Sequence, residues 1–203
     1  QVLKKNGIPE QKIVYLSQVT PHIQAITPVT RKGFVFVGRI NHEKGIELLY
    51  EAARLLEKVP GAFIDLYGPV QATIGTAKDF IQQMGERINI RYKGVLQPDE
   101  VLSVINGYQG LLLPSRVAEM APLTIMDANA LRIPVIASDV PGSVELVQQY
   151  QCGLIFKYGD ARDLAKKIKQ VMEKSTSFLF IQPQERTFRD VAQQYEQIYN
   201  RAS

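Results

Sequence analysis

The sequence has only one cysteine, Cys152, among its 203 residues. One thiol permits no internal disulfide and cannot build a cysteine-rich zinc site. A lone cysteine is also more usual in a reducing compartment than in a secreted protein. No apolar run reaches the roughly 20 residues that cross a bilayer, and the first residues do not resemble a secretion signal. We therefore expect a cytoplasmic protein.

Two further absences narrow the ligand class. The 24 Lys and Arg residues exceed the 20 Asp and Glu residues by only four, and no tract of five or six basic residues occurs. Nucleic acid is therefore not an expected partner. No G-x-G-x-x-G follows the first expected strand and no G-x-x-x-x-G-K-[ST] occurs, so neither a dinucleotide site nor a Walker loop is predicted.

What the sequence does contain is an alternation of short β-rich runs and amphipathic stretches, which is typical of βαβ units. Strands are predicted at 33–38, 62–68, 88–94, 110–115, 134–138 and 153–157, with a further short one, KIVYL, at 12–16. Helices are predicted at 44–58, 74–86, 98–106, 122–132, 142–149, 160–174 and 187–201. The predicted fold class is α/β, a single Rossmann-like domain whose open six-stranded parallel sheet carries helices on both faces.

Ligands of such sheets bind beyond the carboxyl ends of the strands. The first strand is followed by GRINHEKG, in which Arg39 and Lys44 bring two cations to one crevice. The pair could equally be ordinary basic loop residues. An exposed loop histidine is likewise the ordinary interpretation of His42.

The loop after the fourth strand makes the case for an anion site. Pro122 suits the first helical position, where its missing N–H costs nothing. The amides of Ala121, Leu123 and Thr124 would then point into the crevice and favour a phosphate. Glu119 and Asp127 lie up to roughly 12 Å apart if the segment between them is helical. Two carboxylates that flank a diphosphate site suit the hydroxyl groups of a nucleotide sugar.

Four motifs carry a resemblance to a known family. G-R-x-x-x-x-K-G at 38–45, P-S at 114–115, E-x7-D at 119–127 and PVIASDVPGSVEL at 134–146 resemble the donor half of the family 4 retaining glycosyltransferases of the GT-B fold. The resemblance implies that Arg39 and Lys44 hold the diphosphate without a metal and that Glu119 contacts the donor sugar. It implies no cofactor. The donor-binding residues that it implies are Gly38, Val95, Leu96, Met120, Ala121, Pro122, Leu123 and Asp127, with Asp127 on the ribose and 94–96 on the nucleobase.

Besides GPV at 68–70, which lacks a second glycine common in that loop, the sequence departs from the family pattern at two further points. Aspartate stands at position 127, where glutamate is usual, and its shorter side chain changes the reach toward the ribose. Residues 120–122, MAP, replace a common Gly-aromatic-Gly run and alter the floor beneath the sugar. The diphosphate site does not depend on either position.

The length of the sequence suits one of the two domains of a GT-B enzyme. We expect residues 1–32 to be an interdomain connection, 33–186 the nucleotide-sugar-binding domain and 187–203 a helix that returns to the other domain. We expect the acceptor-binding amino-terminal domain to lie outside this sequence. Peripheral association of the full-length enzyme with a membrane is also expected.

The resemblance implies retaining hexosyl transfer to a glycan or lipid-linked hydroxyl acceptor. A UDP-sugar, UDP-glucose in particular, is the favoured donor, while ADP- and GDP-sugars stay open. Cations and a helix start would stabilise the departing nucleoside diphosphate. Two alternatives are a non-catalytic nucleotide-sugar or phosphosugar-binding module and an unrelated flavodoxin-like partner-binding domain.

Overall fold

The computed structural model describes residues 4, 6–14, 19, 29–71 and 89–202. The chain divides into two compact units, of which one comprises Pro21–Gln182 and the other Gln1–Thr20 with Pro183–Ser203. The larger unit holds the sheet. The smaller unit holds a short 3-10 helix at Glu10–Lys12 and α8 at Phe188–Ala202.

Six parallel strands form one sheet, as the sequence predicts. They are β1 (Phe34–Val37), β2 (Ile64–Tyr67), β3 (Ile90–Gly94), β4 (Gly110–Leu113), β5 (Val135–Ser138) and β6 (Gly153–Phe156). The order across the sheet is β3-β2-β1-β4-β5-β6. In β1 the side chains of Phe34 and Phe36 enter the core on one face and that of Val35 the core on the other. Each buried Phe contributes roughly 1.5 to 3 kcal/mol to folding.

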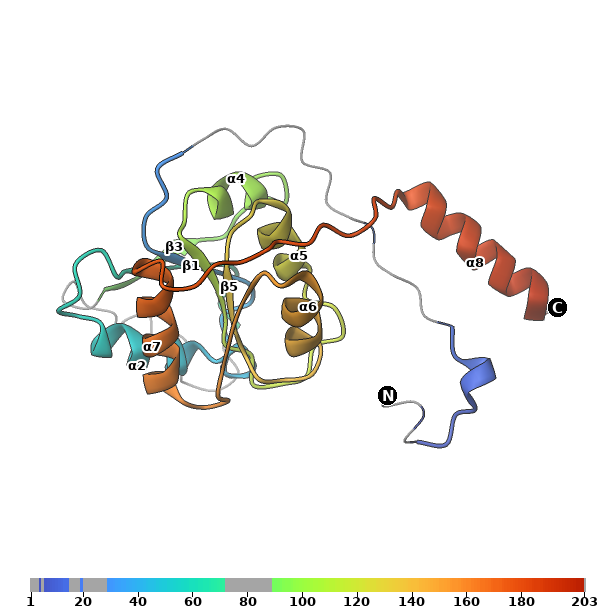
Figure 1. Cartoon of the computed structure of the whole chain (residues 1–203), viewed down its shortest axis with the longest axis horizontal. Helices are drawn as coiled ribbons and strands as arrows, with labels where there is room; N and C mark the ends of the chain where they lie inside the picture. The colour runs from blue at the N-terminus through green and yellow to red at the C-terminus, as the bar shows by residue number, and fades with distance from the viewer. Residues whose placement is uncertain (1–3, 5, 15–18, 20–28, 72–88, 203) are drawn as a thin grey trace. The chain divides into compact units, whose positions relative to one another are not determined.

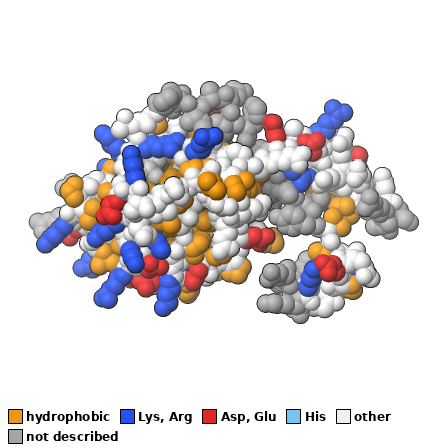
Figure 2. Space-filling model, viewed as in Figure 1, with side chains coloured by type: hydrophobic (Ala, Val, Ile, Leu, Met, Phe, Trp, Pro, Cys, Tyr) orange, Lys and Arg blue, Asp and Glu red, His pale blue; other side chains and the backbone are white. Residues whose placement is uncertain are grey.

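Helices cover both faces of the sheet (Figure 1). On one face lie α2 (Ile46–Leu55) and α7 (Ala161–Met172), which share a core cluster with the side chains of β1 and β2. On the other face lie α4 (Val101–Asn106), α5 (Leu123–Ala130) and α6 (Ser143–Tyr150). Lys and Arg side chains spread over the side where α2 and α7 lie (Figure 2), as expected of the solvated faces of amphipathic helices.

The helix boundaries differ from the predicted ones where local backbone geometry intervenes. The helix predicted from residue 44 begins at Ile46, because residues 42–44 form a 3-10 turn and Gly45 adopts a left-handed conformation with φ 71°. The helix predicted from Pro122 begins at Leu123, because Pro122 has an extended ψ of 104°. Asp160 caps α7, as expected, by accepting hydrogen bonds from the amides of Arg162 and Asp163, both at 3.0 Å.

Two predicted elements, the helix at 74–86 and the strand at 12–16, have no counterpart among the described helices and strands. The helix predicted at 74–86 lies outside the described residues. Of the strand predicted at 12–16, Lys12 belongs to the 3-10 helix, and residues 13 and 14 are not in a strand. Within the described part of the chain, no helix combines the length and the apolar character that crossing a membrane requires.

Candidate functional site

The sheet topology brings two sequence-predicted loops together. The strand order reverses between β1 and β4, which are hydrogen-bonded neighbours. At such a switch point the loops that leave the two strands diverge to opposite faces and open a crevice. The loop after β1 contains Arg39 and Lys44, and the loop after β4 contains Glu119. Lys44 and Glu119, which are 75 positions apart in the sequence, therefore meet at the carboxyl end of the central strands.

The β1–α2 loop is held in shape by Asn41. Its buried side chain accepts a hydrogen bond from the amide of Lys44 at 3.0 Å, which caps the 3-10 turn. Gly45 then passes so close to the β4–α5 loop that a Cβ atom would overlap the carbonyl oxygen of Pro114. A glycine is thus required both for the backbone angle and for the space.

Lys44 and Glu119 form an ion pair across the crevice. The Nζ atom of Lys44 lies 2.8 Å from Oε1 of Glu119, and the two side chains are only 16% and 15% exposed. The hydroxyl of Ser115 donates to the same carboxylate oxygen. Ser115 is itself held by the buried hydroxyl of Ser138, which donates to its carbonyl oxygen at 2.6 Å. Lys44 has two further N–H donors and Glu119 a second oxygen, so both groups keep capacity for a ligand.

The backbone of Glu119 is fixed from the side of α6. The amide of Glu119 donates to the carbonyl oxygen of Pro141 at 3.2 Å. Gly142, with φ 84°, lies against the carbonyl of Glu119 so closely that any side chain there would overlap it. The carboxylate is therefore held at three points, namely its Lys44 and Ser115 contacts and its backbone. Such preorganisation suits a residue that must meet a ligand in a set geometry.

Arg39 does not join this ion pair. Its guanidinium is exposed and donates to Oε1 of Gln71 at 3.3 Å. The side-chain Nδ2 of Asn41 donates to the same Gln71 oxygen at 3.4 Å. The two predicted cations thus lie in one loop, but only Lys44 contacts the acid of the facing loop. In the part of the chain that the structure describes, no contact joins Arg39 to Lys44.

The start of α5 presents backbone donors and apolar side chains. Pro122 is the N-cap rather than the first helical residue, so the first-turn amides begin at Leu123 and Thr124 and have no intrahelical acceptors. Met120 is fully exposed and Leu123 is more than half exposed. No residue of the first turn is acidic. This helix start favours an anionic group over a cationic one.

Asp127 lies one turn into α5 in a partly buried position. Burial raises the pKa of its carboxyl from 3.8 to about 6. Among the described residues its side chain has neither a hydrogen bond nor an ion pair, so nothing offsets the cost of desolvating the charge. A carboxyl group held without a partner keeps its acceptor oxygens for another molecule.

The remaining predicted contacts lie at Gly38 and after β3. Gly38 directly follows β1, and Gly68 lies against its carbonyl oxygen. Val95 is exposed and Leu96 is half-buried in the loop beyond Gly94. Because β3 is the edge strand, this loop lies two strands away from β1.

Sequence reasoning assigned no role to Ser115 or Asn41. Both carried a readable signal, since Asn41 precedes Lys44 by three residues, as an N-cap does, and Ser115 lies within the P-S motif. Their contacts with Lys44 and Glu119 are local, whereas those of Asn41 with Gln71 and of Ser115 with Ser138 depend on tertiary geometry.

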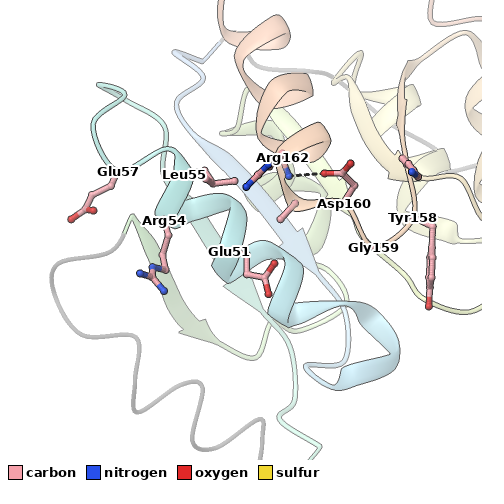
Figure 3. A pocket seen from close by; sticks show the side chains of 10 residues that line it. Glu51, Arg54, Leu55, Glu57, Tyr158, Gly159, Asp160 and Arg162 are labelled. Atoms are coloured by element: carbon pink, nitrogen blue, oxygen red, sulfur yellow. Dashed lines mark hydrogen bonds between the residues drawn. The ribbon is translucent and has the colours of Figure 1, made fainter.

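A separate surface groove lies elsewhere on the larger unit (Figure 3). It runs between α2 and the loop from β6 to α7, and its lining includes Glu51, Arg54, Leu55 and Tyr158. None of the sequence-predicted site residues lines it. The groove therefore provides no support for the predicted site.

The sequence of this chain matches a known protein family over most of its length. Residues 21–190 match the family described as "Glycosyl transferases group 1". A glycosyltransferase of Escherichia coli (strain K12) assigned to colanic acid biosynthesis, WcaL, is 28% identical over 191 residues, covering 87% of this chain and 46% of the relative. The chain thus spans about half the length of this curated relative.

Solved structures share the fold. The apo lipopolysaccharide outer core galactosyltransferase WaaB superposes with a TM-score of 0.74 at 18% identity, over 98% of this chain and 58% of that one. HepE of Anabaena in complex with UDP superposes with a TM-score of 0.67 at 18% identity, over 84% and 49%.

Proposed function

Because the chain belongs to the glycosyl transferases of group 1, we propose that it is the donor-binding half of a retaining, metal-independent hexosyltransferase. The observation that carries the proposal is the Lys44–Glu119 pair, at the switch point of the sheet and beside the start of α5. A cation and free helix amides at this crevice suit the diphosphate of a nucleotide sugar, and the carboxylate suits the hydroxyl groups of its sugar.

Each residue has a proposed role. Lys44 and Arg39 neutralise the diphosphate, and Glu119 accepts hydrogen bonds from hydroxyl groups of the donor sugar. The 120–123 segment meets the sugar and the phosphate through backbone amides, while Gly38 leaves room for the diphosphate. Asp127 accepts from the ribose, and Val95 and Leu96 flank the nucleobase.

The proposed chemistry is substitution at the anomeric carbon with retention of configuration. The bond from that carbon to the diphosphate oxygen breaks, and its electron pair stays on the leaving group. Lys44, Arg39 and the α5 amides stabilise this growing charge. The acceptor hydroxyl attacks from the same face and gives its proton to the departing phosphate oxygen.

The favoured donor is a UDP-sugar, UDP-glucose in particular. HepE, which shares the fold, has been solved with UDP and with UDP-glucose. The relatives are about twice as long as this chain. This supports an acceptor-binding domain elsewhere in the full-length protein, which would receive a glycan or lipid-linked acceptor. Residues 1–32 would connect the two domains, 33–186 would bind the donor and 187–203 would return to the other domain. The single cysteine, Cys152, which is free and buried, is consistent with a cytoplasmic location of the protein.

A non-catalytic nucleotide-sugar-binding module is the alternative, because Lys44 and the start of α5 could bind the diphosphate without any transfer of the sugar. A thermal-shift screen with UDP, ADP, GDP and inorganic phosphate tests the binding that both share. A selective rise in melting temperature with one nucleoside diphosphate is expected, and equal responses to all four would contradict it. Transfer by the full-length enzyme, abolished by Lys44→Ala, separates the enzyme from the module.

A further inference from the structure

A second ion pair joins the same two loops beside the Lys44–Glu119 pair. Nη2 of Arg116, in the β4–α5 loop, lies 3.8 Å from Oε2 of Glu47, in the first turn of α2. The amide of Arg116 donates to the carbonyl oxygen of Glu43 at 2.7 Å. Nδ1 of His42 lies 2.9 Å from the other oxygen of Glu47. None of these contacts involves a residue to which a ligand contact has been assigned.

The two pairs have opposite charge order. In one pair the cation, Lys44, lies just before α2 and the acid, Glu119, lies in the β4–α5 loop. In the other pair the acid, Glu47, lies in the first turn of α2 and the cation, Arg116, lies in the β4–α5 loop. The start of α2 with the turn before it, and the β4–α5 loop, therefore each contribute one charge of each sign to the junction. The four side chains are largely buried, with Glu47 17% and Arg116 27% exposed. Sliding one loop past the other would break both pairs together.

The Glu47–Arg116 pair is held largely away from water. Oε2 of Glu47 and Nε of Arg116 are buried atoms without a hydrogen-bond partner in the described part of the chain. Removing the Glu47 charge would leave the Arg116 guanidinium without an ion-pair partner among the described residues, whereas removing the Arg116 charge would leave Glu47 with His42 alone. Either loss disfavours the present arrangement of the loops. Such a pair fixes geometry more than it stabilises the fold.

We propose that Glu47 and Arg116 are positioning residues that hold Lys44 and Glu119 in the geometry that the nucleotide sugar requires. The proposal rests on the proposed function. Glu47 and Arg116 act through the backbone of the two loops, since Arg116 follows Ser115 directly and Glu47 lies one helical turn from Lys44. Their effect on affinity is therefore carried by Lys44 and Glu119.

The sign of the effect at Glu47 tests the proposal. Glu47→Gln removes a negative charge near an anion site, so simple electrostatics predicts tighter binding of UDP. Positioning predicts weaker binding, by about fivefold or more. Glu51→Gln removes the same charge from the same helix at an exposed position and serves as the matched control, with affinity unchanged or slightly raised.

The measurement is calorimetric titration of UDP into the wild-type chain, Glu47→Gln, Arg116→Gln and the double variant. Both single variants should bind UDP more weakly than wild type. The double variant should bind UDP about as well as whichever single variant has the lower affinity. In a Lys44→Ala background, Glu47→Gln should have little further effect, because Lys44 is the group being positioned. If Arg116→Gln fails to fold, the isosteric Glu47→Gln variant carries the test.

The outcomes separate this inference from the proposed function. A wild-type chain that binds no nucleoside diphosphate overturns the proposed function and the inference with it. A wild-type chain that binds UDP while Glu47→Gln binds it equally or more tightly overturns the inference alone. Full additivity of Glu47→Gln with Lys44→Ala would also overturn it.

Discussion

Glu119 shares one carboxylate oxygen between Lys44 and Ser115. Its other oxygen has no partner in the described part of the chain. The residue can therefore accept from a sugar hydroxyl without releasing Lys44. This arrangement couples the sugar contact to the diphosphate contact through one side chain.

Replacing Glu119 should change ligand discrimination more than nucleotide affinity. Glu119→Gln should weaken the binding of UDP-glucose by about 1 kcal/mol relative to the binding of UDP, because only the nucleotide sugar offers sugar hydroxyls at Glu119. UDP itself should bind as well or better, since Lys44 loses an anionic partner. The measurement is the affinity ratio of the two ligands by calorimetry, and an unchanged ratio would remove Glu119 from the sugar site.

Asp127→Asn should instead weaken the binding of UDP and of UDP-glucose equally, because both ligands carry the ribose. Its effect on the ratio of the two affinities is the matched comparison for Glu119→Gln. A change in the ratio at Asp127, without a change at Glu119, would reverse the assignment of the two acids.

The stability of the chain should depend on pH through Asp127. Its folded-state pKa is raised from 3.8 to about 6, so between these values the folded state binds more protons than the unfolded state. The contribution of Asp127 to the free energy of unfolding therefore falls as pH rises from about 4 to 6, by up to about 3 kcal/mol. Asp127→Asn should melt higher than wild type at pH 7 and similarly at pH 4. Equal differences at both pH values would contradict this origin.

At the scale of elements, Gly45 determines how closely α2 approaches the β4–α5 loop. Gly45→Ala combines a left-handed backbone angle with an overlap on the carbonyl of Pro114. Gly159, with φ 73° and open space around its Cα, offers a matched control for the backbone angle alone. Alanine at Gly159 should cost about 1 to 2 kcal/mol of unfolding free energy.

Alanine at Gly45 should cost about 1 to 3 kcal/mol more than at Gly159, because the overlap must be relieved by moving the loops apart. It should also weaken UDP binding, whereas Gly159→Ala should not. Chemical denaturation and UDP titration measure the two effects. Equal costs in stability at both glycines, with UDP affinity intact, would show that this junction is not closely packed.

At the scale of the whole molecule, the alternation of β-rich and amphipathic runs sufficed to predict the six parallel strands and those helices that fall within the described residues. The strands are shorter than predicted, because the predicted ranges took in flanking residues such as Gly33, Gly38 and Pro134 that lie outside the hydrogen-bonded strands. The start of α5 was placed one residue early, since sequence alone cannot reveal that Pro122 has an extended ψ.

The candidate site was predictable in part. Loop position after β1 and β4 sufficed to suggest that Lys44 and Glu119 would lie near each other. That they form an ion pair, with Arg39 turned to Gln71, depends on rotamers that no spacing encodes. The Glu47–Arg116 pair lay beyond sequence reasoning, because each residue alone resembles an ordinary surface charge.

Titration of UDP in the presence of EDTA tests the central claim most directly, because it asks whether Lys44 and Arg39 serve a diphosphate without metal. Wild-type chain should bind UDP equally with and without EDTA. Lys44→Ala and Arg39→Ala should each weaken binding about ten- to a hundredfold, since each removes a charge-assisted contact. Lys169→Ala, an exposed cation on α7, should leave it unchanged. Binding that is lost on chelation, or that both loop variants retain in full while folded, would contradict the account.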